Sequence, residues 1–126
     1  MIDIKKQIEY WFTNAEYDIE TAELLISQNK ILHGLFFCHL SIEKAIKAHF
    51  VKIKKEIPPK THNLIYLSEV TGIELNEEKN LLLGVLMRFQ LEGRYPEYQP
   101  VIPSKEKASE YLSASKDLVQ WLKKRL

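Results

Sequence analysis

The stretch LHGLFFCHLSIEKAIKAHFVKIK, residues 32–54, decides the fold class of this chain. At 100° per residue, its apolar side chains cover nearly every side of a helix. The larger ones are Leu32, Leu35, Phe36, Leu40, Ile46 and Phe50, and smaller ones lie further round at Cys38, Ala45 and Ala48. A helix that is apolar on nearly all sides belongs in the middle of a bundle. The pattern therefore predicts a central helix with other helices packed around it.

Helical periodicity continues on both sides of this stretch, and all five prolines fall in two gaps, at 58–59 and 96–103. A first helix is predicted over 3–29, because apolar side chains recur there every three or four residues and form one stripe. Its members are Ile4, Ile8, Trp11, Ala15, Ile19, Ala22 and Ile26. A short helix is predicted over 63–71, and Gly72 suits its C-terminal end.

Two more helices are predicted after Gly72. One covers 77–92, with Asn76 as its N-cap and Gly93 at its end. The last runs from residue 105 to the end of the chain, with Ser104 as its N-cap. No segment alternates with the period of a strand. The sequence predicts an all-α fold, an up-and-down four-helix bundle plus one short helix, in a single domain over residues 1–126.

Composition limits the classes of function. The net charge of +1 argues against a broadly basic nucleic-acid binder and leaves room for a local basic site. The single cysteine, Cys38, excludes an internal disulfide and a multi-cysteine zinc cluster. The N-terminus mixes charged with apolar residues, unlike a signal peptide, and the apolar run at 81–87 is far shorter than the roughly 20 residues that cross a bilayer. We expect a cytoplasmic protein that does not enter a membrane.

Three polar residues follow one another at a spacing of four in the central helix: His39, Glu43 and Lys47. His39 and Glu43 fall inside the apolar stripe, and side chains four apart on a helix touch. One interpretation is a buried polar pair that satisfies itself and fixes the register of the helix. The other is a ligand-facing pair that lines a cleft, with Lys47 toward its edge. The residues alone leave both interpretations open.

The common catalytic motifs do not occur. The sequence has no glycine-rich phosphate loop, no H-E-x-x-H pair and no G-x-S-x-G elbow. We therefore expect no metal site and no cofactor. Arg88 is expected either to pair with Glu43 or Glu92 or to point outward, and His62 either to cap the short helix or to face solvent.

Four segments taken together resemble the HEPN domain, named for higher eukaryotes and prokaryotes nucleotide-binding. They are YWFTNAEYDIETAELLI (10–26), FFCHLSIEKAIKAHF (36–50), PPKTHNLIYL (58–67) and GRYPEYQP (93–100). The resemblance covers essentially the whole chain in the same order and is closest to small prokaryotic members. It implies the same helical bundle that the periodicity predicts.

The resemblance also implies a homodimer whose shared cleft holds the site, and exposed apolar residues such as Leu83, Met87 and Phe37 permit such an association. Members are often encoded beside a minimal nucleotidyltransferase as a toxin–antitoxin pair. Many are metal-independent endoribonucleases, whose signature is an arginine followed, after four to six residues, by a histidine. In this chain Arg94 stands in the arginine position, and Gln99 stands where the histidine is expected.

The exchange of histidine for glutamine has chemical consequences. Histidine transfers protons near neutral pH, whereas glutamine does not titrate and only forms hydrogen bonds. Arginine still binds phosphate through its planar fork. We therefore predict a protein that binds a nucleotide or RNA through Arg94, with Tyr95 and Gln99 nearby and with Lys47, His39 and Glu43 as further ligand-facing residues.

Two alternatives stay open. One is a metal-independent endoribonuclease toxin with an altered base, in which His39 or His62 replaces the missing histidine. The other is a structural helical module in which Arg94 pairs with Glu92 or Glu97 and the tyrosines pack against the last helix. If a nucleotidyltransferase partner exists, the hydroxyls of Tyr95 and Tyr98 are its predicted targets.

Overall fold

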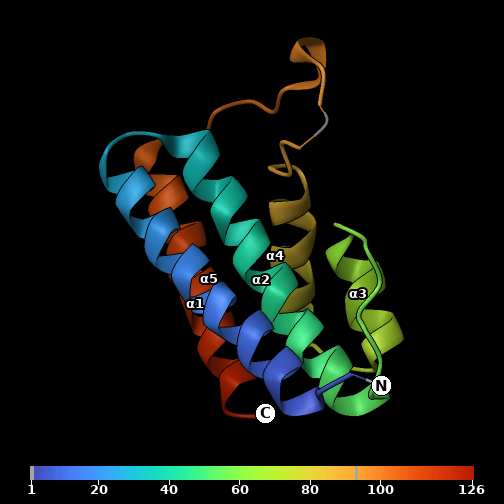
Figure 1. Cartoon of the computed structure of the whole chain (residues 1–126). Helices are drawn as coiled ribbons and strands as arrows, with labels where there is room; N and C mark the ends of the chain where they lie inside the picture. The colour runs from blue at the N-terminus through green and yellow to red at the C-terminus, as the bar shows by residue number, and fades with distance from the viewer. Residues whose placement is uncertain (1, 93) are drawn as a thin grey trace.

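The computed structural model describes residues 2–92 and 94–126, and this part of the chain is helical without strands. Its elements are α1 (Ile4–Ser27), α2 (Ile31–Lys54), α3 (Leu64–Thr71), α4 (Glu77–Met87), the 3₁₀ helix η1 (Pro96–Tyr98) and α5 (Lys105–Lys123). The long helices α1, α2 and α5 run side by side, while α3 and α4 pack on the opposite side of α2 (Figure 1). The predicted all-α, up-and-down bundle with one additional short helix is confirmed.

Helix α2 is the centre of the bundle, as its apolar pattern predicts. It packs against α1, α3, α4 and α5. From Cys38 to Val51 nearly every side chain of α2 is buried. At the start of α2, Gly34 permits the close approach of α1, because a Cβ built there would lie 2.5 Å from Cγ1 of Ile26.

The ends of α4 and α5 follow the predicted capping residues, whereas α3 is capped by Asn63 and not by His62. The side chains of Asn63, Asn76 and Ser104 each accept a hydrogen bond from the backbone N–H three residues on, at the starts of α3, α4 and α5. Gly72 ends α3 with φ of 80°, in the left-handed region where glycine is favoured. The predicted caps therefore located two helix starts and one helix end.

Helix α4 is shorter than predicted. It ends at Met87, five residues before the expected end at 92. The chain then tightens, because the N–H of Phe89 bonds to the carbonyl of Leu86 in a 3₁₀-type turn. The carbonyls of Met87 and Gln90 accept hydrogen bonds from the guanidinium of Arg94, so a side chain replaces a further helical turn as their partner. The predicted helix end at Gly93 lies outside the described residues.

The predicted exposure of Leu83 is wrong. Leu83 is fully buried beside Leu82 and Leu86, because the inner face of α4 packs on α2 and α3.

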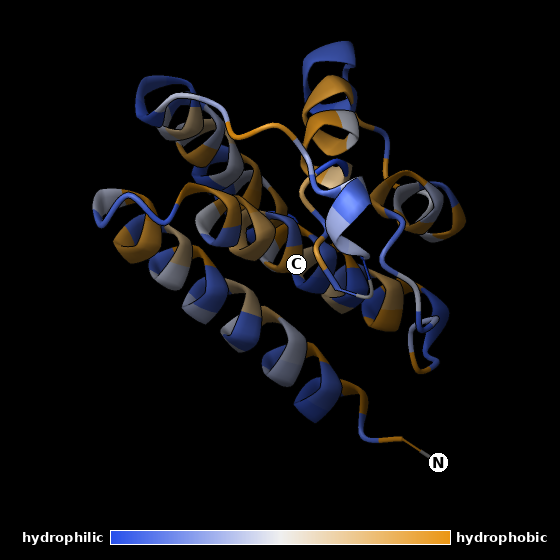
Figure 2. Ribbon diagram, turned by 90° about the horizontal axis from the view of Figure 1, so that it is seen from above, coloured by the Kyte–Doolittle hydropathy of each residue, from blue (hydrophilic) through white to orange (hydrophobic). Residues whose placement is uncertain are grey.

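Seen from above, the connection between η1 and α5 carries a hydrophobic stretch (Figure 2). Its Val101 is 90% exposed and its Ile102 is 62% exposed. Met87 and Phe37 are half-buried. Among the described residues, no helix combines the length and the apolar character that crossing a membrane requires.

Candidate functional site

The three polar residues predicted on the central helix lie together inside the bundle. His39, Glu43 and Lys47, here named the buried polar row, are 0%, 3% and 6% exposed. The ammonium of Lys47 lies 3.0 Å from Oε2 of Glu43 and 5.2 Å from the ring centroid of Trp11 on α1. Nδ1 of His39 lies 3.9 Å from Oε1 of Glu43. Lys47 pairs with Glu43 as predicted, whereas Nδ1 of His39 has no hydrogen-bond partner among the described residues, so the prediction that His39 and Glu43 satisfy each other is wrong. The row is covered rather than open to solvent.

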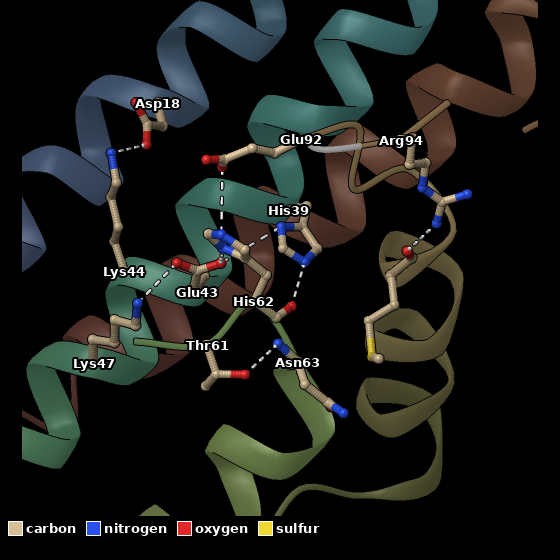
Figure 3. A network of polar contacts seen from close by, with 11 residues as sticks. Asp18, His39, Glu43, Lys44, Lys47, Thr61, His62, Asn63, Glu92 and Arg94 are labelled. Carbon is tan, nitrogen blue, oxygen red and sulfur yellow. Dashed lines mark hydrogen bonds and ion pairs between the residues drawn. The ribbon is translucent and has the colours of Figure 1, made fainter. Parts of the chain in front are cut away.

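His62, from the connection that precedes α3, covers the buried polar row. Its Nδ1 lies 2.9 Å from Oε1 of Glu43, and its backbone carbonyl lies 2.9 Å from Nε2 of His39 (Figure 3). A carbonyl only accepts hydrogen bonds, so Nε2 of His39 carries its proton. An ionised carboxylate also only accepts, so Nδ1 of His62 donates to Glu43. These contacts fix which nitrogen of each ring faces which partner.

His39 is held in its neutral form. Burial lowers the pKa of His39, and the nearby carboxylate of Glu43 opposes this effect without reversing it. The neutral ring leaves Nδ1 as a buried acceptor, and within the described part of the chain no donor reaches it. The ring therefore serves to anchor the backbone of His62.

The other nitrogen of His62 faces outward. Its side chain is 43% exposed, and Nε2 lies 3.4 Å from Oε2 of Glu92, which is itself mostly exposed. The ring thus stands between a buried carboxylate and a surface carboxylate. His62 neither caps α3, where Asn63 has that role, nor simply faces solvent. Among the described residues, Arg88 forms no ion pair with Glu43 or Glu92. Its side chain is exposed, as the second predicted alternative has it.

Arg94 is held by backbone carbonyls. Its guanidinium donates to the carbonyls of Gln90, Tyr98 at 3.0 Å and Met87 at 3.3 Å. These bonds join the end of α4 to η1 and shape residues 94–103, here named the Arg94 loop. The fork has five N–H donors, so donors remain for a ligand.

The structure does not bring all of the predicted site residues together. Tyr95 and Gln99 are exposed on the Arg94 loop, whereas the buried polar row lies in the bundle, and Figure 3 shows Arg94 pointing away from the ring of His62. Arg94 instead shares a hollow of about 300 Å³ with Arg88, here named the arginine hollow. Its lining residues in the described part of the chain are Arg88, Phe89, Arg94, Pro100 and Val101, and none is acidic.

Sequence reasoning named Arg94 and the row but missed two features. The contact of His62 with Glu43 joins residues 19 apart, and the only hint was the polar triplet Thr61, His62 and Asn63 before a helix. The sequence also did not indicate that Arg88 and Arg94 line the same hollow, because the helix predicted over 77–92 continues past Arg88. Within the described ranges, no group of three or more His, Cys, Asp or Glu side chains is arranged as a set of metal ligands.

Comparison with known proteins supports the fold. TT1696 from Thermus thermophilus superposes with a TM-score of 0.81 at 16% identity, over 95% of this chain and 98% of that one. ST0689, described as an archaeal HEPN homologue, superposes with a TM-score of 0.64 at 19% identity, over 94% and 96% of the two chains. No curated protein sequence matches the chain. The sequence model of the HEPN domain matches residues 8–126, and the chain therefore belongs to the HEPN domain family.

Proposed function

We propose that this protein binds the phosphate groups of a nucleotide or RNA in the arginine hollow, through Arg94 together with Arg88. One observation carries the proposal: two arginines and an aromatic ring line the same hollow, and no lining residue opposes an anion. Guanidinium groups bind phosphate oxygens through paired N–H donors. The volume of the hollow, about 300 Å³, is at the lower end of the range of small-ligand sites.

The neighbouring residues suit the rest of a nucleotide. Tyr95 and Tyr98 present exposed rings on the Arg94 loop, and aromatic rings stack on bases whatever their sequence. The amide of Gln99 offers a donor and an acceptor to a base edge or a phosphate. The near-neutral net charge fits a local site of this kind better than a broad electrostatic surface.

Arg88→Ala is the sharpest test of phosphate binding. Arg88 has an exposed side chain that makes no hydrogen bond within the described part of the chain, so its loss changes the charge of the hollow with little effect on the fold. Binding of a fluorescent single-stranded RNA should weaken. The slope of log affinity against log salt should become shallower by roughly 0.7 for the lost contact.

Lys124→Ala is the matched control, because it removes the same charge from an exposed position at the end of α5, away from the hollow. It should leave RNA affinity and its salt slope close to the wild-type values. If both substitutions weaken RNA affinity equally, the binding comes from general charge attraction. That result would contradict the arginine hollow as the binding site.

The proposal includes the setting that the family resemblance suggests: a cytoplasmic homodimer paired with a minimal nucleotidyltransferase in a toxin–antitoxin system. Two observations support it. The exposed Val101 and Ile102 offer apolar surface for association, and the hydroxyls of Tyr95 and Tyr98 are accessible to a modifying enzyme. Light scattering on the purified protein should give the mass of a dimer. A monomer mass would contradict the proposed homodimer.

Incubation with a minimal nucleotidyltransferase and nucleoside triphosphates tests the partnership. The expected product carries a nucleotidyl group on Tyr95 or Tyr98, located by peptide mass spectrometry. The double substitution Tyr95→Phe, Tyr98→Phe should abolish the modification, and Tyr66→Phe, at an exposed position on α3, serves as the matched control. Modification that persists in the double variant would contradict the assignment.

A further inference from the structure

We propose that the end of the bundle opposite the Arg94 loop docks on the surface of an anionic lipid bilayer. This end, here named the basic end, consists of residues 2–6 at the start of α1, 52–57 at the end of α2 and 124–126 after α5. Figure 1 shows these three segments at one end of the bundle and the Arg94 loop at the other. The observation that carries the proposal is the combination of lysines and exposed isoleucines on this surface.

Contacts join the three segments into one surface. The ammonium of Lys52 donates to the backbone carbonyl of Arg125 at 3.3 Å, so the end of α2 lies beside the end of the chain. The start of α1 adjoins the end of α2, because both segments line a hollow of about 580 Å³. The lining residues of this hollow are Ile2, Ile4, Lys55, Glu56 and Ile57. The basic end is therefore continuous across three helices.

Positive charge is concentrated at the basic end. It holds seven of the 18 lysines and arginines but two of the 17 acidic residues, so the net charge of +1 combines a strongly positive end with a negative remainder. One of the two acids, Asp3, is engaged as the N-cap of α1. The seven basic side chains are exposed, and within the described part of the chain none forms an ion pair. They are Lys5, Lys6, Lys52, Lys54, Lys55, Lys124 and Arg125.

Helix stability explains only part of this charge. Lys52 and Lys54 lie in the last turn of α2, where the helix dipole favours cations. Lys55 ends the same helix with φ of 60°, in the left-handed region where glycine is favoured. Lys5 and Lys6 lie in the first turn of α1, where the dipole disfavours cations. The lysines at these last three positions work against local stability, and an anionic partner accounts for them.

The apolar residues of the basic end favour a lipid surface over a nucleic acid. Ile53 is 50% exposed and Ile57 is 59% exposed among the lysines. Aliphatic side chains with lysines around them suit the boundary between headgroups and acyl chains, and lysine stems lie along apolar groups while their ammonium groups reach the headgroup phosphates. Single-stranded nucleic acids are bound instead by stacking on aromatic rings, and the three segments of the basic end contain no aromatic residue.

Docking by the basic end leaves the rest of the molecule accessible. With this end on the bilayer, the long helices stand on the membrane, and the Arg94 loop lies at the far end of the bundle (Figure 1). Contact with the headgroups needs no membrane-spanning helix. The inference therefore goes beyond the proposed function and does not depend on it.

The test is flotation of the purified protein with vesicles of phosphatidylglycerol and phosphatidylcholine, and with vesicles of phosphatidylcholine alone. Wild type should bind only the mixed vesicles, and added salt should weaken the binding. A basic residue near an anionic surface strengthens binding by about fivefold, so Lys54→Ala combined with Lys124→Ala should weaken it by about 25-fold. Lys30→Ala combined with Lys105→Ala removes the same charge from exposed positions at the other end and should bind as wild type does.

A second pair of variants tests the apolar contact. Ile57→Ser should weaken binding to the mixed vesicles by about tenfold, because an exposed isoleucine that enters the headgroup boundary loses its contact with water. Its dependence on salt should stay that of wild type, since no charge changes. Ile102→Ser is the matched control, because Ile102 is 62% exposed on the Arg94 loop, and it should leave vesicle binding unchanged. Circular dichroism confirms that each variant is folded.

Several results would overturn the inference. One is failure of wild type to bind the mixed vesicles, and another is equal binding to phosphatidylcholine alone. Equal weakening by the two pairs of lysine substitutions would remove the basic end as the docking surface. If Lys54→Ala with Lys124→Ala weakens the binding of single-stranded RNA and leaves vesicle binding unchanged, the basic end is a nucleic-acid surface and the lipid assignment is wrong.

Discussion

The buried polar row and the Arg94 loop are both polar, and they are held in opposite ways. The row is enclosed in the bundle: Lys47 pairs with Glu43, and His39 and Glu43 each bond to His62, which comes from another segment. The loop stands at the surface, and one arginine holds it by donating to three backbone carbonyls. Packed helices and the segment before α3 therefore support the row, whereas one side chain supports the loop.

The difference teaches where stability and adaptability are located. A buried charge is costly unless it is paired, so each partner in the row depends on the others. An exposed loop with few buried contacts opens locally at low free-energy cost. We expect substitutions in the row to change global stability, and substitutions in the loop to change local order and ligand binding.

Glu43→Ala should have the largest effect. It leaves the cation of Lys47 buried and His62 without its acceptor, and removal of one partner of a buried ion pair costs about 3–5 kcal/mol. Urea denaturation measures the loss of unfolding free energy. Glu97→Ala, at an exposed position on η1, is the control and should lie within about 0.5 kcal/mol of wild type. A loss below about 1 kcal/mol for Glu43→Ala would show that the row is hydrated and would remove the contrast between the regions.

Acidification should lower the unfolding free energy of the bundle, because a second buried histidine, His49, resists protonation in the folded chain. Nε2 of His49 donates to the carbonyl of Leu122 at 2.7 Å and joins α2 to α5. Burial lowers the pKa of His49, with Lys52 and Arg125 acting in the same direction. The unfolded chain therefore takes up this proton more readily than the folded chain. The contribution is fully present above the unfolded pKa of about 6.5 and is lost as the pH falls below it.

His49→Gln should reduce that dependence, because the amide retains a donor but does not titrate. Unfolding midpoints in urea at neutral and at mildly acid pH should differ less in this variant than in wild type. His33→Gln, which changes an exposed histidine, should retain the wild-type difference. If the unfolding midpoint of His49→Gln depends on pH as strongly as that of wild type, another residue causes the acid sensitivity. The buried His39 would be the next residue to test.

Arg94→Ala should have a smaller global effect and a clear local one. Loss of its three bonds to backbone carbonyls frees residues 94–103, while the helices stay packed. The unfolding free energy should fall by less than about 1 kcal/mol, and the loop should become more sensitive to limited proteolysis. Arg88→Ala, which removes no hydrogen bond recorded in the described part of the chain, is the control and should leave cleavage in the loop unchanged. If Arg94→Ala lost as much unfolding free energy as Glu43→Ala, the loop would have to be part of the core.

Gln99→His should have the smallest effect on stability. Gln99 is exposed, and surface substitutions of this kind change the unfolding free energy by no more than about 0.5 kcal/mol. Thermal denaturation measures this directly, with Gln120→His, at an exposed position on α5, as the control. A stabilisation or loss well above that value would show that residue 99 has contacts beyond the exposed loop.

The sequence predicted the bundle well and the site only in part. The positions of α2, Asn76, Ser104 and Gly72 follow from local rules of periodicity and capping, and the structure confirms them. The pairing of Glu43 with Lys47 was also predictable, because residues four apart on one helix face the same way. The predicted pairing of His39 with Glu43 was not confirmed, because His39 instead bonds to the backbone of His62. The end of α4 was not, because it depends on carbonyls that the side chain of Arg94 occupies from beyond the helix. The reach of a single domain over residues 1–126 stays a prediction.

By itself, the sequence determined which segments are helices, that α2 is central, and that a histidine, a carboxylate and an amine share one of its faces. Only the tertiary structure decided that His62 closes on Glu43, that Glu92 meets the other side of the same ring, and that Arg88 and Arg94 line one hollow. The physical reason is the range of the forces involved. Helix formation and capping depend on neighbours within about one turn, whereas these contacts depend on how the packed helices direct the connecting segments.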